Sequence, residues 1–284
     1  MEKFDLTISV VLYKNQHAEI KKVISSIAQT RLSYRLFLID NSPTDSLRIF
    51  AGRENTEYFF NNGNIGFGKA QNIVISKIIE QSCYHLIVNP DISFENGTLD
   101  KIHAFMEQNP GIGQLMPKVC YKDGSIQKLC KLLPHPIDLI GRRFFNNLYA
   151  KTRRSKVYEL SDFCYDQILD TPALSGCFMF TRTAVLKKVN GFDPRYFMYL
   201  EDFDLTRRIN KISRTVFYPG ASVTHVFSKA SYSDLRLLKH HIISAIKYFN
   251  KWGWFFDKER STLNKKVLAQ IEDYKSERKL IPEL

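Results

Sequence analysis

The fold of this chain is decided by Leu6–Leu12, LTISVVL, a run rich in β-branched and aliphatic residues. Such a run is typical of a strand that is buried on both faces of a sheet. Apolar residues at helical spacing follow within Ile20–Ile27, and Leu36–Ile39 predicts a second buried strand. The alternation continues with a third strand at Tyr58–Phe60, a helix at Lys69–Glu80 and a fourth strand at Tyr84–Val88. It predicts an α/β fold with a parallel sheet and helices on its faces.

Polar residues stand where three of these strands end. Asp40 ends the second strand, the loop Asn61–Gly68 follows the third, and Asn89-Pro90-Asp91 follows the fourth. In parallel α/β sheets, ligands bind at the carboxyl ends of the strands. We therefore expect these three segments to converge on one edge of the sheet.

The pattern changes after residue 110. Gln114–Tyr121 predicts a strand, Asp123-Gly124 is a hairpin turn signal, and Ser125–Leu129 is a candidate return strand. Leu132–Asp170 has poor periodicity and a one-sided basic cluster, so we expect an irregular, partly mobile insert near the active site. Its charge is either a solvated face or a contact for a phosphorylated or lipid-anchored substrate.

The last third of the chain is expected to be mixed and then helical. Leu235–Phe256 is an amphipathic stretch rich in aromatic residues and lysines. Two interpretations stay open for it: packing on the core, or anchoring at a bilayer interface. The other elements expected here are a strand at Leu174–Thr181, a short helix at Thr183–Val189, a late strand at Arg214–Tyr218 and a polar surface helix at Arg260–Leu284.

These elements suggest a division of the chain. Residues 1–230 form the main domain, whose pattern changes between the halves 1–110 and 111–230. Residues 231–284 form a C-terminal helical region, a candidate for membrane association.

The net charge of +12 implies an anionic partner: nucleic acid, an acidic membrane surface or phosphorylated ligands. No nucleic-acid module is recognisable, which argues against nucleic acid as the partner.

The five cysteines lack CxxC or zinc-site spacing and predict free, buried thiols in a reducing compartment. The N-terminus does not resemble a signal peptide, and no apolar stretch approaches the ~20 residues that span a bilayer. We expect a cytoplasmic protein, with peripheral attachment to the inner face of the plasma membrane as an option.

An acidic pair, Glu201-Asp202, lies between an aromatic run, Tyr196–Tyr199, and a segment with helical character, Asp204–Ile209. A carboxylate at a helix N-terminus beside apolar side chains is held in one orientation with an altered proton affinity, as a general base requires. An acidic residue at a helix start is also a common helix cap.

Two further motifs carry weaker signals. Gly66-Phe67-Gly68 does not fit a dinucleotide-binding loop, because Gln71 occupies the third glycine position and the motif follows the third strand. Its glycines suit a close approach of the backbone to a nucleotide. Asn89-Pro90-Asp91 presents one carboxylate that suits a hard divalent cation bridging a diphosphate, and it reads equally well as a turn.

Taken in order, these motifs resemble the inverting glycosyltransferases of family 2, which have a GT-A fold, and in particular their rhamnosyltransferase-like branch of bacterial surface polysaccharide synthesis. The resemblance covers Leu6 to about Tyr248 and implies a mixed, mainly parallel sheet flanked by helices. It rests on Ile8–Asn15, Ile39–Ser42, Asn61–Asn72, Asn89–Asp91, and Ser175-Gly176 through Gly191–Asp193 to Glu201-Asp202.

The resemblance implies that residues 1–110 are a nucleotide-binding half and residues 111–230 an acceptor-binding half. For the donor side, it implies a set of nucleotide-binding residues. Asp40 would hydrogen-bond the pyrimidine base, and Tyr13 would line the same pocket. Asn64, Gly66 and Asn72 would shape the nucleotide-binding side.

For the metal and the base, the resemblance implies that Asp91 ligates Mg²⁺ or Mn²⁺ as the surviving acid of a D-x-D motif. Asn89 replaces the first acid and is assigned to the nucleotide-binding side. His225 would be a second metal ligand, although a lone histidine is often structural. Asp202 would be the base, with Glu201 beside it, and which of the two acts stays open.

The implied activity is transfer of a sugar from a dTDP-, UDP- or GDP-linked donor, such as dTDP-rhamnose, to a hydroxyl of a lipid-linked oligosaccharide. The alternative is a non-catalytic sugar-nucleotide-binding or scaffold subunit of a polysaccharide assembly complex.

Overall fold

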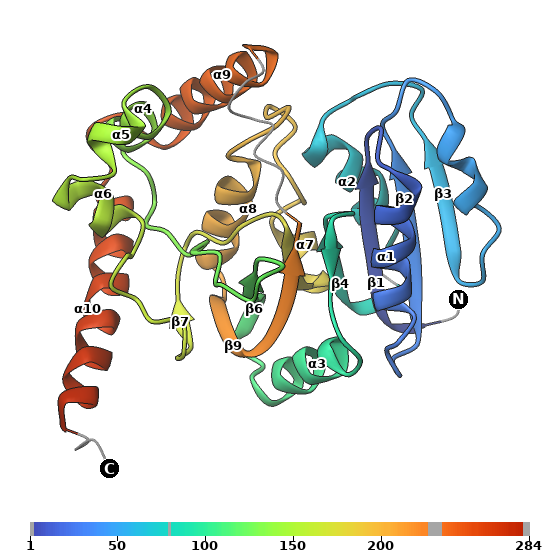
Figure 1. Ribbon diagram of the computed structural model, residues 1–284, viewed down its shortest axis with the longest axis horizontal. Helices are drawn as coiled ribbons and strands as arrows, with labels where there is room; N and C mark the ends of the chain where they lie inside the picture. Colours follow the sequence, from blue (N-terminus) through green and yellow to red (C-terminus); the bar gives the residue numbers. More distant parts are fainter. Residues whose placement is uncertain (1–2, 79–80, 227–234, 281–284) are drawn as a thin grey trace.

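The computed structural model describes residues 3–78, 81–226 and 235–280 of the 284-residue chain. Within them lies a nine-stranded mixed sheet with the order β3-β2-β1-β4-β8-β6-β9-β5, in which β7 pairs with β9 (Figure 1). The strands are β1 Phe4–Leu12, β2 Tyr34–Asp40, β3 Thr56–Phe60, β4 Ser82–Val88, β5 Ile92–Ser93, β6 Ile112–Cys120, β7 Leu169–Asp170, β8 Phe178–Arg182 and β9 Arg214–His225.

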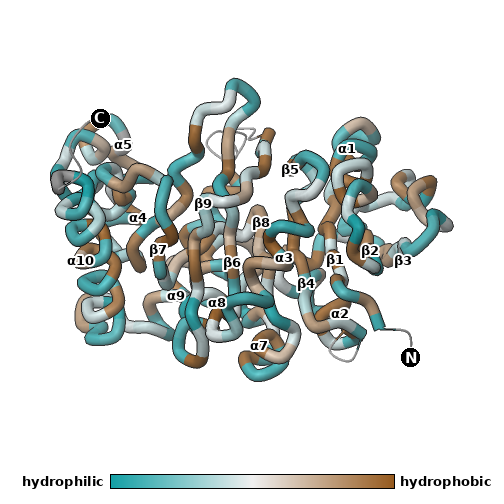
Figure 2. Tube along the Cα trace, turned by 90° about the horizontal axis from the view of Figure 1, so that it is seen from below, coloured by the Kyte–Doolittle hydropathy of each residue, from teal (hydrophilic) through white to brown (hydrophobic). Residues whose placement is uncertain are grey.

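The first half of the sheet confirms the expected parallel α/β arrangement. β1 pairs in parallel with β2 and β4, and β2 pairs in parallel with β3. Alternate residues of β2 point to opposite faces. Leu36 and Leu38 belong to the core that includes α1 (His17–Ile27), whereas Phe37 and Ile39 pack with α2 (Phe67–Ile78). Both faces are thus covered, and hydrophobic residues run along the central strands (Figure 2).

The second half is where the sheet becomes mixed. β8 lies antiparallel between β4 and β6, and β6 pairs in parallel with β9. Three features of this sheet differ from expectation: β5 and β7 are additional strands, β8 begins only at Phe178, and β9 extends to His225, which was expected in a loop.

The helices of the second half are α3 Thr98–Gln108, α7 Thr183–Lys188 and α8 Glu201–Asn210; a 3₁₀ helix, Ser46–Phe50, lies in the first half. Neither α3 nor the 3₁₀ helix was anticipated.

The expectation of an irregular insert at 132–170 is wrong in part, because the segment contains α4 (Pro136–Phe144), α5 (Asn146–Tyr149) and α6 (Arg153–Tyr158). Pro136 lies at the start of α4 instead of breaking a helix, a position that proline favours. Asp138 then binds the segment together, since its carboxylate accepts hydrogen bonds from the Tyr149 hydroxyl at 2.7 Å and from Arg154 at 2.6 Å.

The candidate return strand at Ser125–Leu129 is also wrong. The turn itself forms, with Gly124 at φ +84° and its N–H bonded to the Tyr121 carbonyl at 3.0 Å. Beyond it, the pairing is reduced to a single bridge between Cys120 and Ile126. The chain then leaves the strand, and the Gln127 side chain turns toward the end of β9.

The cysteines are all free, as expected, but only two are buried. Cys130 and Cys177 lie in the core, Cys120 is partly buried, and Cys83 and Cys164 are exposed. The sequence pattern excludes metal-site spacing but carries no information on the burial of each thiol.

The C-terminal region forms α9 (Leu235–Trp252) and α10 (Lys258–Leu280). The sequence left open whether its aromatic residues pack on the core or anchor at a bilayer, and in the structure some of them are buried and others are exposed. Tyr248 and Phe249 are buried against the core, whereas Phe255 is 64% and Phe256 96% exposed. None of the described helices is long and apolar enough to cross a membrane.

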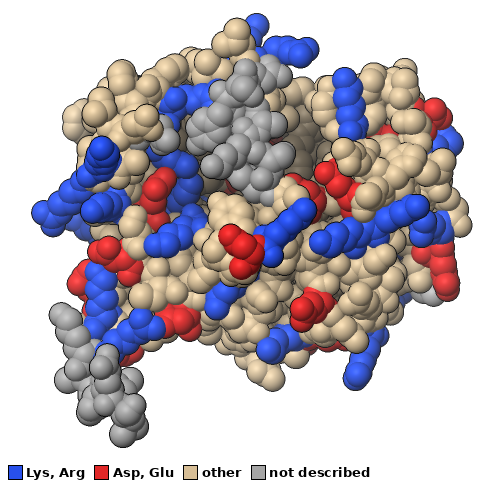
Figure 3. All heavy atoms as spheres, in the orientation of Figure 1, with Lys and Arg blue, Asp and Glu red and all other residues tan. Residues whose placement is uncertain are grey.

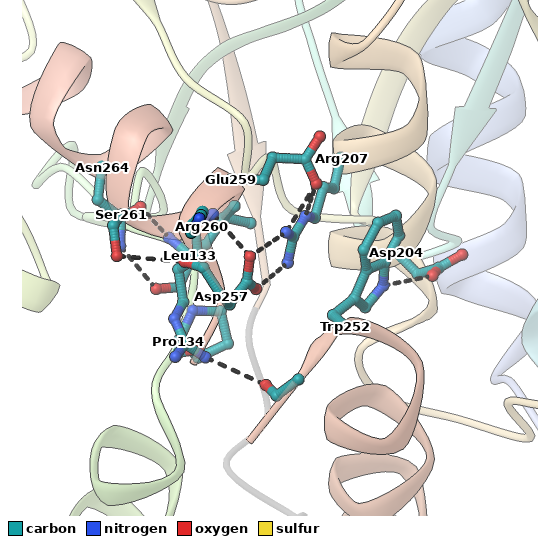
Figure 4. Close-up of polar contacts among 12 residues, drawn as sticks. Leu133, Pro134, Asp204, Arg207, Trp252, Asp257, Glu259, Arg260, Ser261 and Asn264 are labelled. Carbon is teal, nitrogen blue, oxygen red and sulfur yellow. Dashed lines mark hydrogen bonds and ion pairs between the residues drawn. The ribbon is translucent and has the colours of Figure 1, made fainter. Parts of the chain in front are cut away.

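A buried ion-pair network ties these helices to α8 (Figure 4). The Arg207 guanidinium donates two hydrogen bonds of 2.8 Å to Asp257 and also contacts Glu259 at 2.7 Å. The Trp252 indole donates to Asp204 at 2.9 Å. Breaking a buried pair leaves an uncompensated charge, which costs about 3–5 kcal/mol. The C-terminal helices are therefore firmly attached to the helix that carries the acidic pair.

Candidate active site

A cleft of about 430 Å³ brings the two halves of the predicted site together. Asn89 and His225 line it, and so do Glu201 and Asp202. The candidate base and the candidate metal ligand therefore border the same hollow, although they lie more than 20 residues apart in the sequence.

Asp91 and His225 are adjacent because β5 pairs antiparallel with the end of β9, placing Ile92 opposite His225. The Asp91 Oδ2 atom lies 3.3 Å from His225 Nε2. The Asp91 Oδ1 atom is buried and has no hydrogen-bond partner among the described residues. A buried carboxylate oxygen without a donor is costly unless a cation or water satisfies it.

Gln127, which sequence reasoning missed, fixes the state of His225. Its amide nitrogen donates to the His225 backbone carbonyl at 2.9 Å, so its amide oxygen must face His225 Nδ1, also at 2.9 Å. An amide oxygen only accepts, and therefore Nδ1 carries a proton. In the neutral ring, this leaves the Nε2 lone pair directed toward Asp91, an arrangement of two electron donors that suits a metal ion.

Asp91 and His225 fit a divalent cation whose remaining ligands come from the donor. A site made of protein ligands alone is not found, because among the described residues no group of three or more His, Cys, Asp and Glu side chains could hold a metal. Asp91 and His225 would supply two ligands, and a diphosphate with water can fill the other positions of an octahedral ion.

The acidic pair begins α8 after two residues with left-handed backbone, Tyr199 at φ +71° and Leu200 at φ +64°. Such a conformation is uncommon outside glycine and often marks functional sites. Both oxygens of Asp202 accept backbone hydrogen bonds of 2.9 Å, one from Gly176 N–H and one from Phe203 N–H. The carboxylate is therefore held in one orientation.

The environments of the two acids differ. Burial and, to a smaller extent, the negative charge of Asp202 together raise the pKa of Glu201 to about 8. Burial also raises the pKa of Asp202, but the backbone hydrogen bonds and Lys131 oppose that shift. Glu201 thus holds its proton at pH 7, and Asp202, whose charged form is favoured by the backbone hydrogen bonds and by Lys131, is the better candidate for the carboxylate of the pair.

This difference predicts a pH dependence of stability. Unfolded Glu201 loses its proton near pH 4.5, whereas the folded protein holds it to about pH 8. The folded state binds more protons in this window, so its stability falls as pH rises through it, by up to about 1.4 kcal/mol per pH unit. Glu201→Gln should remove this slope in urea unfolding measured from pH 5 to 8. Glu95→Gln, at an exposed position, should keep it; equal slopes in both variants would contradict the assignment.

Two cations of the cleft were not among the predicted site residues. Lys131 and Arg142 line it, and burial, followed by the charge of Arg142, lowers the pKa of Lys131 to about 8. Arg142 pairs with Glu159 at 3.1 Å. Arg142 falls in the insert and Lys131 directly precedes it; the charge pattern of the insert pointed to an anionic ligand without saying which side chains reach the cleft.

The predicted nucleotide-binding residues other than Asn89 lie outside the lining of this cleft. Asp40 is fully buried at the end of β2, where its carboxylate accepts hydrogen bonds from Tyr58 at 2.5 Å and Ser42 N–H at 2.8 Å. Tyr13, at the end of the neighbouring β1, is 47% exposed. The Asn64 side chain accepts from Gly66 N–H at 3.0 Å. These residues share the carboxyl edge of the first three strands.

Gly66 and Asn72 join the two halves of the fold. Gly66 has φ +92°, and a Cβ there would lie 2.5 Å from the Phe197 carbonyl. The Asn72 amide exchanges hydrogen bonds of 2.8 and 2.9 Å with the backbone of Phe192. Both contacts fix the loop that leads to Glu201, a positioning role that the sequence did not indicate.

The fold and this cleft define the class of the protein: the chain has the GT-A glycosyltransferase fold. It is similar to a mannosyltransferase from Pyrobaculum calidifontis in complex with GDP-Man and Mn²⁺, with a TM-score of 0.56 and 17% identity. That match covers 87% of this chain and 65% of the other, so the chain spans just under two thirds of that structure.

In sequence, the chain is similar to rhamnosyltransferases. It is 26% identical to an N-acetylglucosaminyl-diphospho-decaprenol L-rhamnosyltransferase of Mycobacterium tuberculosis, over 90% of this chain and 88% of the relative. It is 24% identical to the rhamnosyltransferase WbbL of Escherichia coli, over 85% of this chain and 92% of the relative. No family model matches the chain. The relatives confirm the resemblance to rhamnosyltransferase-like glycosyltransferases of family 2.

Proposed function

We propose that this protein is an inverting glycosyltransferase that moves rhamnose from dTDP-rhamnose to a hydroxyl of a lipid-linked oligosaccharide in polysaccharide synthesis. The observation that carries the proposal is the single cleft lined by both Asp202 and His225, the latter in contact with Asp91. The names of the rhamnosyltransferase relatives support the choice of rhamnose as the sugar and of a lipid-linked acceptor.

The reaction is one displacement. The acceptor hydroxyl bonds to the anomeric carbon, the bond from that carbon to the nucleoside diphosphate breaks, and the hydroxyl proton passes to Asp202. Gly176 and Phe203 hold the Asp202 carboxylate in place for this transfer. A positioned base contributes about 10²–10⁴ in rate. A single displacement inverts the anomeric carbon and needs no carboxylate nucleophile.

Asp91 and His225 would hold Mg²⁺ or Mn²⁺. When bound, the cation would supply positive charge against the negative charge that develops on the departing diphosphate. Asn89 and the β1–β3 edge with Tyr13 and Asp40 would bind the rest of the donor. We place the reaction at the cytoplasmic face of a membrane, where a lipid-linked acceptor is accessible.

Gln127 offers a test of the metal site. Gln127→Leu should weaken Mn²⁺ binding about 10–100-fold, because the tautomer and orientation of His225 are no longer fixed. Calorimetric titration with Mn²⁺ measures the effect. Gln108→Leu, at an exposed position on α3, should leave the affinity unchanged, and equal affinities for the two variants would remove Gln127 from the site.

The function itself is tested by incubating the purified chain with Mn²⁺, an N-acetylglucosaminyl-diphospho-polyprenol and dTDP-, UDP- or GDP-sugars in turn. We expect transfer from dTDP-rhamnose, with inversion visible by NMR of the product. Tight binding of a nucleotide sugar without transfer to any acceptor would favour a non-catalytic subunit.

A further inference from the structure

A second hollow of about 230 Å³ opens between α4 and α9. Ile140 and Phe144 of α4 and Ile242 and Ile246 of α9 line it, and each keeps between 39% and 54% of its surface exposed. Phe249 of the core cluster also lines it. We call this hollow the α4–α9 groove. The end of the molecule that carries α4 and α5 presents mostly uncharged atoms, with Lys and Arg around them (Figure 3).

The α4–α9 groove adjoins the active-site cleft. Leu139 and His241 line both hollows. Cations gather at this junction: Arg143 lines the groove, and Arg142 lines the cleft. Their charges both act on His241, whose pKa is lowered to about 4, chiefly by burial. Lys131 also lines the cleft, and the charge of Asp202 acts on it there.

Three chemically distinct regions therefore adjoin one another. The base, Asp202, is followed by the cations Lys131, Arg142 and Arg143, and these by an apolar groove. A sugar linked through a diphosphate to an isoprenoid chain presents the matching sequence of a hydroxyl, negative charge and hydrocarbon. Apolar surface removed from water contributes about 25 cal/mol per Å², and phosphates favour arginine partners.

We propose that the α4–α9 groove binds the first part of the acceptor's polyprenyl chain, while the cations at its junction with the cleft hold the diphosphate. The inference rests on the proposed function and specifies its acceptor site. A bilayer surface and a second copy of the chain are the alternative occupants. The polyprenyl chain is favoured because the groove is concave, is continuous with the cleft and has cations where the two meet.

The test measures binding of geranylgeranyl diphosphate to the full chain in EDTA, which keeps the metal out of the donor site. Trp254 lines the groove and is one of two tryptophans in the chain, so its fluorescence reports occupancy. Ile140→Asn should raise the Kd at least about tenfold, because a polar group replaces an apolar contact. Ile246→Asn, on the facing helix, should act in the same direction.

Ile137→Asn is the matched control. Ile137 lies on the same helix with the same 50% exposure as Ile140 but does not line the groove. It should change the Kd by less than about twofold. Equal effects of Ile140→Asn and Ile137→Asn, or no saturable binding to the wild type, would overturn the proposal. Circular dichroism confirms that each variant is folded.

The alternative occupants give different results. If Ile140→Asn lowers sedimentation with phosphatidylglycerol vesicles but leaves probe affinity unchanged, the groove is a bilayer contact. If it changes the oligomeric state instead, the groove is a self-association surface. Either result overturns the proposal. Failure of sugar transfer to any acceptor refutes the proposed function separately, because probe binding is measured without donor or metal.

Discussion

Asp202→Asn is expected to lower the rate of sugar transfer about 10²–10⁴-fold while leaving donor affinity within about twofold. Asparagine keeps the size of the side chain, and its amide oxygen can still accept one of the backbone hydrogen bonds, from Gly176 or Phe203. It cannot take a proton from the acceptor hydroxyl. Single-turnover transfer from dTDP-rhamnose and calorimetric binding of dTDP measure the two quantities independently.

Glu201→Gln is the control for this change, since it alters the neighbouring acid by the same chemistry. Glu201 is buried and neutral at pH 7, so glutamine resembles its state in the folded protein. We expect this variant to keep at least about a tenth of the wild-type rate. The opposite ranking of the two variants would assign the base to Glu201, and near wild-type rates in both would exclude the pair from proton transfer.

The central strands of the first half, β1, β2 and β4, could be predicted because they are buried on both faces. Such strands need continuous apolar runs, and the runs LTISVVL and LFLI predict β1 and β2 from the local sequence alone. The helices at 132–170 could not be found in this way. α4 depends on a proline at its start and on Asp138, whose partners Tyr149 and Arg154 come from later turns of the chain.

The site residues show the same difference between local patterns and tertiary contacts. Asp91 and Asp202 stand in motifs whose order along the chain carries information, whereas His225 is a lone histidine that only the family resemblance points to. The structure places Asp202 and His225 in the lining of one cleft and Asp91 beside His225. Gln127 and Lys131 stand in no motif. Each acts through an interaction that forms only after folding: Gln127 hydrogen-bonds His225, and Lys131 interacts electrostatically with Asp202. Pattern reading from one sequence does not recover such tertiary contacts.

The attachment of α8 has a consequence for the acidic pair. Asp202 lies at the first turn of α8, and Arg207, further along the same helix, is bonded to Asp257 in the turn before α10. Asp204 holds Trp252 at the end of α9. The base and the α4–α9 groove are thus built on helices that are fixed to one another, as precise placement of an acceptor hydroxyl requires.

Asp91→Ala is expected to abolish most of the contribution of Mn²⁺ to nucleotide binding. Removing this carboxylate leaves His225 as one protein ligand beside the diphosphate oxygens, and even outer-shell changes cost metal affinity about 10–100-fold. In saturating Mn²⁺ for the wild type, the Kd for dTDP should therefore rise more than about tenfold, which corresponds to about 1.4 kcal/mol. In EDTA, the variant and the wild type should bind dTDP equally, since Asp91 acts through the metal.

The comparison of the two conditions separates a metal ligand from a structural residue. A change that merely disturbed the β5–β9 pairing would weaken dTDP binding with and without Mn²⁺, and it would lower the free energy of unfolding. Asp162→Ala, which removes an acid with a 74% exposed side chain outside the cleft lining, controls for the loss of one negative charge and should bind as the wild type does. Equal affinities for dTDP with and without Mn²⁺ in the wild type would rule out a metal at Asp91. A Mn²⁺-dependent gain that survives in Asp91→Ala would place the metal on other residues.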